Sequence, residues 1–234
     1  MNKLIESFLI AIPLTLFTFW LGSYLGWITE VNWLEVFAVV TSYSCTWLCS
    51  RQSRLNYPVG VVTTIAYTIL FWQWSMPALA LFNLYLVFSL AYGWFRWGPD
   101  GKTRPVSFTK PKDYIFYALF GLVVLGMFLG ANLWINPEGI SALNPTDIKL
   151  AVASGVAQLM LDNKKLENWF IWAGINIVSI PFFLDSGLVL VAFQYVFFLL
   201  NTGIGFILWL RSMKVVKGLW LKFLTKVEKV AKHA

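Results

Sequence analysis

Apolar residues come in long runs along this chain, and short polar or charged segments separate them. Eight of these runs approach the roughly 20 residues that a helix needs to cross about 30 Å of hydrocarbon. The first run lacks a clear small-residue cleavage site, so we predict a retained helix and not a signal peptide. The predicted membrane spans are residues 7–27, 33–50, 57–74, 77–97, 114–134, 147–161, 168–184 and 187–210.

The composition is that of a membrane protein. Hydrophobic residues make up 59% of the chain and charged residues 12%, against about 45–50% and about 25% in soluble domains. A soluble core has no use for this much apolar surface in a chain of 26.7 kDa. The predicted fold class is therefore an all-α polytopic membrane protein.

The distribution of positive charge supports eight spans. With a cytoplasmic N-terminus, 17 of the 18 Lys and Arg residues fall on the cytoplasmic side and only Lys149 on the other. This is the positive-inside pattern, and it predicts that both termini are cytoplasmic. The basic tail, residues 211–234, then lies where an amphipathic helix meets anionic lipid. The net charge of +7 thus gives no reason to expect nucleic-acid binding.

The stretch from Asn56 to Trp97 occurs twice. A shift of 112 positions places it on Asn168–Trp209 without a gap, and Gly93 then meets Gly205. Identities also extend back to residues 40 and 42, which match 152 and 154. Chance similarity among apolar helices is the alternative, but rare Asn, Gly and Trp residues recurring in register favour a true repeat. Repeats in transporters mark two half-bundles that share a site.

The repeat predicts a domain organisation. Its two copies lie four spans apart, so both cross the membrane in the same direction, and an odd number of helices must join them. We predict an N-terminal transmembrane helix (1–30), a first three-helix bundle (31–97), a linker with a central transmembrane helix (98–146), a second three-helix bundle (147–210) and the basic cytoplasmic tail (211–234).

Neutral polar and aromatic residues within the spans predict a polar cavity between the two half-bundles. Trp172, Asn176 and Ser179 have helical spacing and share one face. The alternative for any one of them is a hydrogen bond between helices. Rings beside amides suit a flat, polar ligand, including a cationic one. The residues in question are Trp47, Thr63, Thr64, Tyr67, Asn83 and Tyr85 in the first copy, and Trp169, Trp172, Asn176, Ser179, Gln194, Tyr195 and Asn201 in the second.

The sequence holds no sign of catalysis. It has no P-loop, metal-binding His–Glu motif or nucleophile elbow, so we predict no enzyme, no catalytic residue, no metal and no cofactor. Cys45 and Cys49 share a helix face and are expected to pack as small apolar groups. Acidic residues fall at span ends or in loops. This placement argues against a proton relay in mid-membrane and favours passage down a gradient.

At these residues the chain resembles the PnuC family of nicotinamide riboside transporters, whose architecture is related to the SWEET sugar transporters. The stretches that carry the resemblance are WLEVFAVVTSYSCTWL (33–48), LNYPVG (55–60), AYGWFRW (91–97), LENWFIWAGINIVS (166–179) and QYVFFLLNTGIGFILW (194–209). Together they span most of residues 33–210.

The resemblance implies facilitated diffusion of nicotinamide riboside (vitamin B3) across a bacterial inner membrane for NAD biosynthesis. It also implies a homotrimer and a cytoplasmic kinase that traps the substrate. Two positions depart from the family pattern: Thr63 stands where Asn is usual, and Asn83 where Gln is usual. Asn56 and Asn168 are expected to be structural. The implied substrate-binding residues are Trp47, Thr63, Asn83, Trp172, Asn176, Gln194 and Tyr195.

Three alternatives remain open at this point. The first is a transporter of thiamine or another vitamin or nucleoside, because thiamine is also a flat cation. The second is an integral-membrane enzyme acting on lipids, which would need an acidic metal cluster or a His base. The third is a membrane scaffold that transports nothing.

Overall fold

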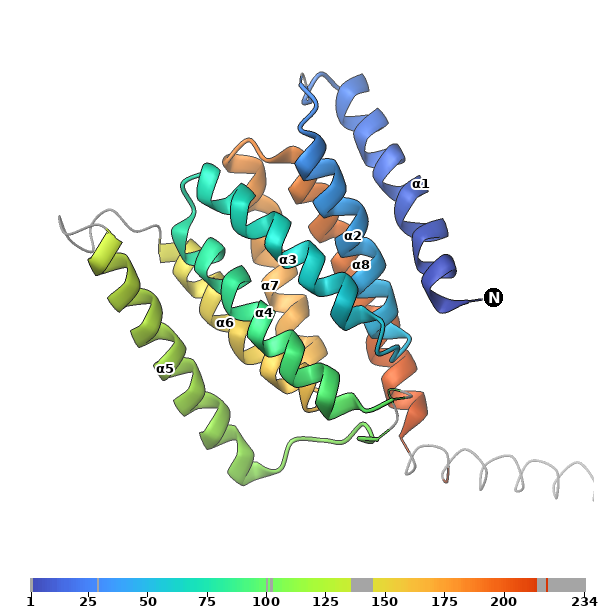
Figure 1. The fold of residues 1–234 in the computed structure, drawn as a ribbon, viewed down its shortest axis with the longest axis vertical. Helices are drawn as coiled ribbons and strands as arrows, with labels where there is room; N and C mark the ends of the chain where they lie inside the picture. The colour runs from blue at the N-terminus through green and yellow to red at the C-terminus, as the bar shows by residue number, and fades with distance from the viewer. Residues whose placement is uncertain are drawn as a thin grey trace, which may run out of the picture.

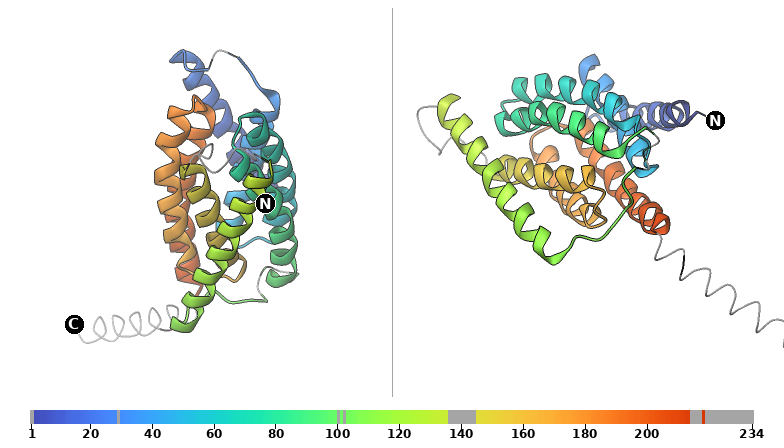
Figure 2. Two further views of the ribbon diagram at one scale, coloured as in Figure 1. Left: turned by 90° about the vertical axis from the view of Figure 1, so that its left-hand side faces the viewer. Right: turned by 60° about the horizontal axis from the view of Figure 1, so that its bottom comes forward.

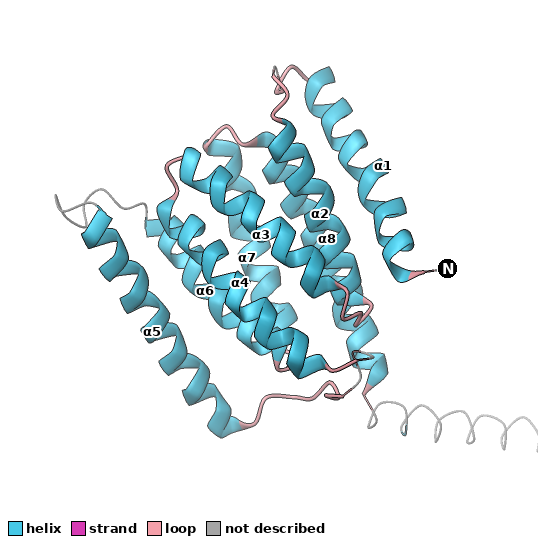
Figure 3. Ribbon diagram, viewed as in Figure 1, coloured by secondary structure: helices cyan, strands magenta, loops and turns pink. Residues whose placement is uncertain are grey.

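The structure is a computed structural model that describes residues 2–28, 30–99, 101, 103–135, 145–213 and 218. Within them it contains eight α-helices, as predicted, and their ends lie within a few residues of the predicted ones (Figure 1). Loops join the helices, and no strand is drawn in the described residues (Figure 3). The helices are α1 (Lys3–Tyr24), α2 (Trp33–Ser50), α3 (Asn56–Gln73), α4 (Pro77–Trp97), α5 (Pro111–Ile135), α6 (Pro145–Asp162), α7 (Asn168–Asp185) and α8 (Val189–Ser212).

Six of these helices form a closed ring. Neighbouring helices in the ring contact one another in the order α2, α3, α4, α6, α7, α8 and back to α2. The first half, α2–α4, and the second half, α6–α8, therefore meet along two seams, α2 against α8 and α4 against α6. One turned view shows the two halves side by side (Figure 2). Corresponding helices run in the same direction (Figure 1), which confirms the predicted pair of parallel three-helix bundles.

The remaining two helices lie outside the ring in equivalent places. Helix α1 packs on α2 and α8, and α5 packs on α6 and α4 (Figure 1). A pseudo-twofold rotation that exchanges the halves therefore also exchanges α1 with α5. From the sequence we predict an extra N-terminal helix and a linker helix. In the fold, each of these two helices flanks one seam.

Because the helices alternate in direction, the N-terminus and the connections 51–55, 98–110 and 163–167 gather at one end of the bundle (Figure 1). We call it the basic end, since Arg51, Arg54 and Lys164 are there. The predicted basic tail lies outside the described residues, apart from 211–213 and 218.

The turns of the two halves repeat each other in backbone detail. Gln52 and Lys164, which are equivalent in the repeat, both have a φ of 50°. Ser75 and Gly187, also equivalent, have φ values of 56° and 73°. A left-handed backbone is uncommon for residues other than glycine, so its recurrence in register at two turns supports a true repeat.

The repeated asparagines close these turns. The Nδ2 atom of Asn56 donates to the carbonyl oxygen of Ser53 at 2.6 Å. Asn168 makes the equivalent bond to the carbonyl oxygen of Lys165. Both asparagines are buried, and their amides bond the chain itself, which is the structural role expected for them.

The repeated glycines each make room for an aromatic ring. A Cβ atom on Gly93 would collide with the ring of Tyr57, and one on Gly205 would collide with the ring of Trp169. Position 57 is equivalent to position 169, so α4 approaches α3 as α8 approaches α7. Glycine is required here because the rings lie directly against the helix backbone.

By length and composition, four of the described helices are able to cross a membrane: α1, α4, α5 and α8. The other four have 18 residues each and complete the ring. On α1, exposed residues such as Leu9, Leu16 and Trp20 form an apolar outer face suited to lipid.

Candidate binding cavity

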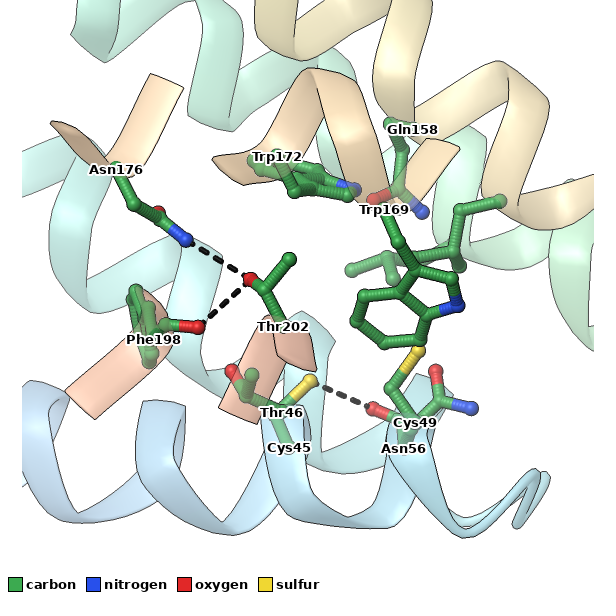
Figure 4. Close-up of a pocket in the computed structure, with 12 residues that line it drawn as sticks. Cys45, Thr46, Cys49, Asn56, Gln158, Trp169, Trp172, Asn176, Phe198 and Thr202 are labelled. Carbon is green, nitrogen blue, oxygen red and sulfur yellow. Dashed lines mark hydrogen bonds between the residues drawn. The ribbon is translucent and has the colours of Figure 1, made fainter. Parts of the chain in front are cut away.

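Two connected cavities lie inside the ring. The first, of about 160 Å³, is lined by residues from all six ring helices. The second, of about 150 Å³, is nearer the basic end, and Figure 4 shows its lining. The residues that line both cavities are Cys45, Thr46, Leu90, Gln158, Trp172 and Phe198.

The ring brings six of the seven predicted site residues to these cavities. Trp172 lines both of them, and Asn176 lines the second. The first cavity is lined in addition by Thr63, Asn83, Gln194 and Tyr195. Both halves thus contribute, as the repeat predicted, and the residues' contact with a ligand stays a prediction.

Trp47 is not brought to the cavities. Its Nε1 atom donates to the Glu6 carboxylate on α1 at 3.2 Å. The Trp47 side chain lines a separate, mainly apolar cavity between α1, α2 and α8. Helix α1 covers the face of α2 that carries Trp47, so this residue holds α1 against the ring.

Asn83 lines the first cavity, and the protein bonds the nitrogen of its amide but not the oxygen. Its Nδ2 atom donates to the carbonyl oxygen of Leu79 at 2.9 Å, and that partner can only accept. The assignment of the nitrogen is therefore dictated by chemistry. The Oδ1 atom has no hydrogen-bond partner among the described residues and is free for a ligand donor.

Asn176 is oriented in the same sense. Its Nδ2 atom donates at 3.0 Å to Oγ1 of Thr202. The Thr202 hydroxyl in turn donates to the carbonyl oxygen of Phe198 at 2.7 Å (Figure 4). The hydroxyl can therefore only accept from Asn176. The Asn176 carbonyl oxygen again lacks a partner among the described residues.

Gln158 is the third amide with this arrangement. Its Nε2 atom donates to the Asp162 carboxylate at 3.0 Å, and an ionised carboxylate accepts only. Sequence reasoning did not select Gln158, although its position on α6 is equivalent to that of Thr46 on α2, which also lines both cavities. The repeat could therefore have identified it.

Gln194 is used at both ends by the protein. Its Nε2 atom donates to Ser42 across the α2/α8 seam, and its Oε1 atom accepts from the Tyr67 hydroxyl. All three side chains are buried. Gln194 therefore joins α2, α3 and α8 around the first cavity.

Two buried indole donors of cavity-lining residues lack a partner among the described residues: Nε1 of Trp169 and Nε1 of Trp172. Buried polar groups without partners are costly. A bound ligand with hydroxyl or carbonyl groups would satisfy them.

Stacked rings close the cavities at the end opposite the basic end. Tyr67 stacks on Phe71 with ring centroids 5.3 Å apart, Phe71 on Phe183 at 6.0 Å, and Phe183 on Tyr195 at 5.1 Å. Phe71 and Phe183 are equivalent in the repeat, so the pseudo-twofold axis passes between them. The four rings span both halves.

A second aromatic cluster closes the basic end. Trp97 and Trp209, also equivalent, have centroids 5.7 Å apart. Each meets the aromatic ring of its own half edge-on, Tyr57 at 5.2 Å and Trp169 at 5.3 Å. Both halves thus build a layer of rings at each end of the six-helix ring.

Lys164 secures this end across the axis. Its ammonium group donates to Oε1 of Gln52 at 3.1 Å and to the carbonyl oxygen of Gly101, and it lies 4.6 Å from the Trp97 ring centre. The side chain is buried, and this burial lowers the pKa of Lys164 to about 8.

Asp162 is the feature that sequence reasoning missed most clearly. It is the last residue of α6, at the span end where the sequence places it, and it is fully buried. Besides Gln158 it accepts hydrogen bonds from Tyr57 at 3.2 Å and Ser89 at 2.7 Å. Asp147, in the first turn of α6, is also buried. The sequence indicates that both carboxylates lie at helix ends, but it does not indicate that they are buried.

Cys45 and Cys49 both line the second cavity. Cys45 and Cys49 are free thiols, and the Sγ atom of Cys45 donates to the carbonyl oxygen of Asn56 at 3.3 Å (Figure 4). Among the described residues, no three His, Cys, Asp or Glu side chains are grouped closely enough to hold a metal ion.

Two repeated half-bundles around a common cavity, built from apolar helices, define a multi-pass membrane protein with the architecture of a transporter. The chain belongs to the nicotinamide mononucleotide transporter family, whose model matches residues 32–211. This confirms the predicted family resemblance and the prediction that the chain is not an enzyme.

Individual relatives are distant. The nicotinamide riboside transporter PnuC of Escherichia coli (strain K12) is 20% identical over 210 residues, which are 79% of this chain and 88% of the relative. The PnuC of Neisseria mucosa is 25% identical over 201 residues, 80% of this chain and 75% of the relative. A crystal structure of the vitamin B3 transporter PnuC matches with a TM-score of 0.70, 20% identity and 93% of each chain, which confirms the fold.

Proposed function

We propose that this protein carries nicotinamide riboside across the membrane by facilitated diffusion, in the cavity enclosed by the six-helix ring. Relatives named as nicotinamide riboside transporters support this substrate. The orientation of three cavity amides carries the argument from the chain itself. The side-chain N–H groups of Asn83, Gln158 and Asn176 donate hydrogen bonds to the protein, and their side-chain carbonyl oxygens have no partner among the described residues.

Such a cavity suits this ligand chemically. Nicotinamide riboside has a cationic pyridinium ring, a carboxamide with two N–H donors, and ribose hydroxyls. Carbonyl oxygens accept from those donors and present the negative ends of their dipoles to the cation. The Trp172 ring adds a surface on which a flat cation stacks.

Transport would proceed by rocking of the two halves around the ligand. The stacked rings at one end and the Trp97–Trp209 pair at the other would separate in turn. Each layer contains residues of both halves, so a small rotation of one half against the other opens one end while the other stays closed.

Binding and flux test the proposal together. Calorimetry with the purified protein should give saturable heat with nicotinamide riboside, and liposomes containing only this protein should take up the labelled vitamin. Thiamine serves as the second ligand, because it too is a flat cation. Binding of thiamine alone would transfer the proposal to that vitamin, and the absence of any vitamin flux would contradict a transporter function.

Substitution of two tryptophans distinguishes a residue that lines the cavities from one that holds α1 in place. Trp172→Ala should abolish uptake, because it removes a ring that lines both cavities. Trp47→Ala should keep uptake of the same order as the wild type, because this ring faces α1. Uptake in vesicles, normalised to protein in the membrane, makes the comparison. Loss of uptake in the Trp47 variant alone would restore the sequence-based assignment of that residue to the site.

We further propose that the basic end faces the cytoplasm of a bacterial inner membrane, with both termini on that side. A homotrimer and a cytoplasmic kinase that phosphorylates the imported vitamin stay predictions from the family resemblance. Labelling of single cysteines placed in the connections 51–55 and 74–76 tests the orientation. Light scattering of the detergent-solubilised protein tests the trimer.

A further inference from the structure

One buried carboxylate stands directly behind the cavity wall. Asp162 is fully buried and does not itself line either cavity, but Gln158, one helical turn earlier on α6, lines both. The hydrogen bond between the two side chains, 3.0 Å long, is the link between this carboxylate and the cavity.

All three groups that contact the carboxylate are donors. Tyr57 and Gln158 donate to Oδ1, and Ser89 donates to Oδ2. Burial of a carboxylate favours its neutral form, and these three donated hydrogen bonds act in the opposite sense and favour the charged form. No Lys or Arg of the described residues forms an ion pair with Asp162, so its negative charge is not cancelled by a local cation.

The repeat supplies a natural comparison. The position equivalent to Asp162 is Ser50, and the position equivalent to Ser89 is Asn201. The first pair bonds across the α4/α6 seam and the second across the α2/α8 seam, where Ser50 donates to Oδ1 of Asn201 at 2.9 Å. A neutral pair therefore suffices to join helices at this place, and the charge at Asp162 calls for another explanation.

We propose that Asp162 is a positioning residue that makes the cavity selective for cationic ligands. It fixes the Gln158 amide with its carbonyl oxygen free for the ligand, and in its ionised form it places a negative charge behind that amide. The ligand class is an organic monocation with hydrogen-bond donors. This inference rests on the proposed function, because nicotinamide riboside is the cation taken as the probe.

The test compares two ligands of the same shape and different charge. Nicotinamide riboside is a cation, and its 1,4-dihydro form is neutral with the same ribose and carboxamide. Affinities of both are measured by calorimetry for the wild type, Asp162→Asn and Asp162→Ser. The serine variant introduces the residue that the other half has at this place, which favours folding.

The wild type should bind the cation more tightly than the neutral form, and both variants should reduce that preference by about tenfold. This is the change expected when one charge roughly 10 Å away is removed at an effective dielectric constant of about 20. Ser89→Ala, which removes a donor but keeps the charge, should retain the preference. Equal losses for both ligands in the Asp162 variants would leave this residue a purely structural role and overturn the inference.

Further outcomes separate this inference from the function on which it rests. A wild type that binds neither ligand contradicts the proposed function itself. If neither Asp162 variant folds, Gln158→Met decides, because loss of the fixed carbonyl oxygen should weaken both ligands at least tenfold. Unchanged affinity in that variant would overturn the inference while leaving the proposed function intact.

Discussion

The two seams between the halves are equivalent in the repeat but differ in chemistry. At the α4/α6 seam, Asp147 accepts from the backbone N–H groups of Ala78 and Leu79 at 3.2 and 3.1 Å. These groups begin α4 and have no partner within the helix. A buried carboxylate thus joins the seam at the end opposite the basic end, and the helix dipole of α4 favours its charge there.

At the α2/α8 seam the equivalent residue is Glu35, and it makes no such bond. Glu35 faces Leu188, Val189 and Leu190, at the start of α8, across a cavity of about 180 Å³. Its carboxylate accepts no hydrogen bond from any described residue. At the same depth in the membrane, one seam is therefore held by charge-assisted hydrogen bonds and the other is not.

Nearer the basic end, the difference between the seams is one of charge. Asp162 and Ser89 bond at one seam, whereas the neutral Ser50 and Asn201 bond at the other. The comparison teaches that a duplicated scaffold can lose a hydrogen bond at one equivalent place and keep one of different chemistry at another. The α4/α6 seam accordingly has carboxylate hydrogen bonds at both of these places, and the α2/α8 seam has a neutral one at one of them.

The largest expected effect is at Asp147. Asp147→Ala would leave two N–H groups at the start of α4 in the protein interior without partners, which should cost about 3 kcal/mol of stability. Glu35→Ala, the matched change at the other seam, should cost less than about 1 kcal/mol, because no hydrogen bond is lost. Thermal unfolding of the detergent-solubilised proteins measures both. Equal destabilisation by the two substitutions would contradict the difference between the seams.

The next effect is expected at the serines. Ser89→Ala removes a donor to a carboxylate and should cost about 2 kcal/mol, whereas Ser50→Ala removes a neutral hydrogen bond and should cost about 1 kcal/mol. Asn201 keeps a partner in the second variant, since its Nδ2 atom also donates to the carbonyl oxygen of Thr46 at 3.1 Å. The same unfolding assay gives the order, and a larger loss in the Ser50 variant would reverse it.

The third prediction concerns pH and the pair Gln52 and Lys164 at the pseudo-twofold axis. Burial lowers the pKa of Lys164 from 10.5 to about 8 in the folded protein. Between these values the unfolded chain binds more protons, so stability rises with pH across the window. The slope from this group is at most about 1.4 kcal/mol per pH unit.

A melting profile between about pH 8 and about pH 10 tests this prediction. Lys164→Met removes the titrating group and should flatten the rise, whereas Gln52→Met, the matched change across the axis, should leave it in place. A profile of the Lys164 variant as steep as that of the wild type would show that another group is responsible.

Much of the fold could be predicted because lipid imposes a simple rule on sequence. Runs of apolar residues near the required length gave all eight helices, and the recurrence of Asn56 and Gly93 in register gave the parallel repeat. Each of these residues has a defined role in the backbone: Asn56 closes a turn, and Gly93 leaves room for the Tyr57 ring.

The site was harder to predict, for two physical reasons. Helix α2 contacts α3 and α8 within the ring and α1 outside it, so a polar or aromatic residue of α2 can face the cavity or any of these helices; Trp47 faces α1. The depth of a helix end is also invisible in sequence. Asp162 ends a helix and is nevertheless covered by α3 and α4, whose residues Tyr57 and Ser89 lie more than 70 positions away in the chain.

The lining of the two cavities affects the energy of transport. No carboxylate lines either cavity, so a cation would cross without a counter-ion and carry net charge with it. A membrane potential of 100 mV, negative inside, acts on one such charge with about 2.3 kcal/mol, enough to concentrate it roughly fiftyfold. Uniport alone would then suffice for accumulation of a charged vitamin, because the membrane potential would drive its uptake.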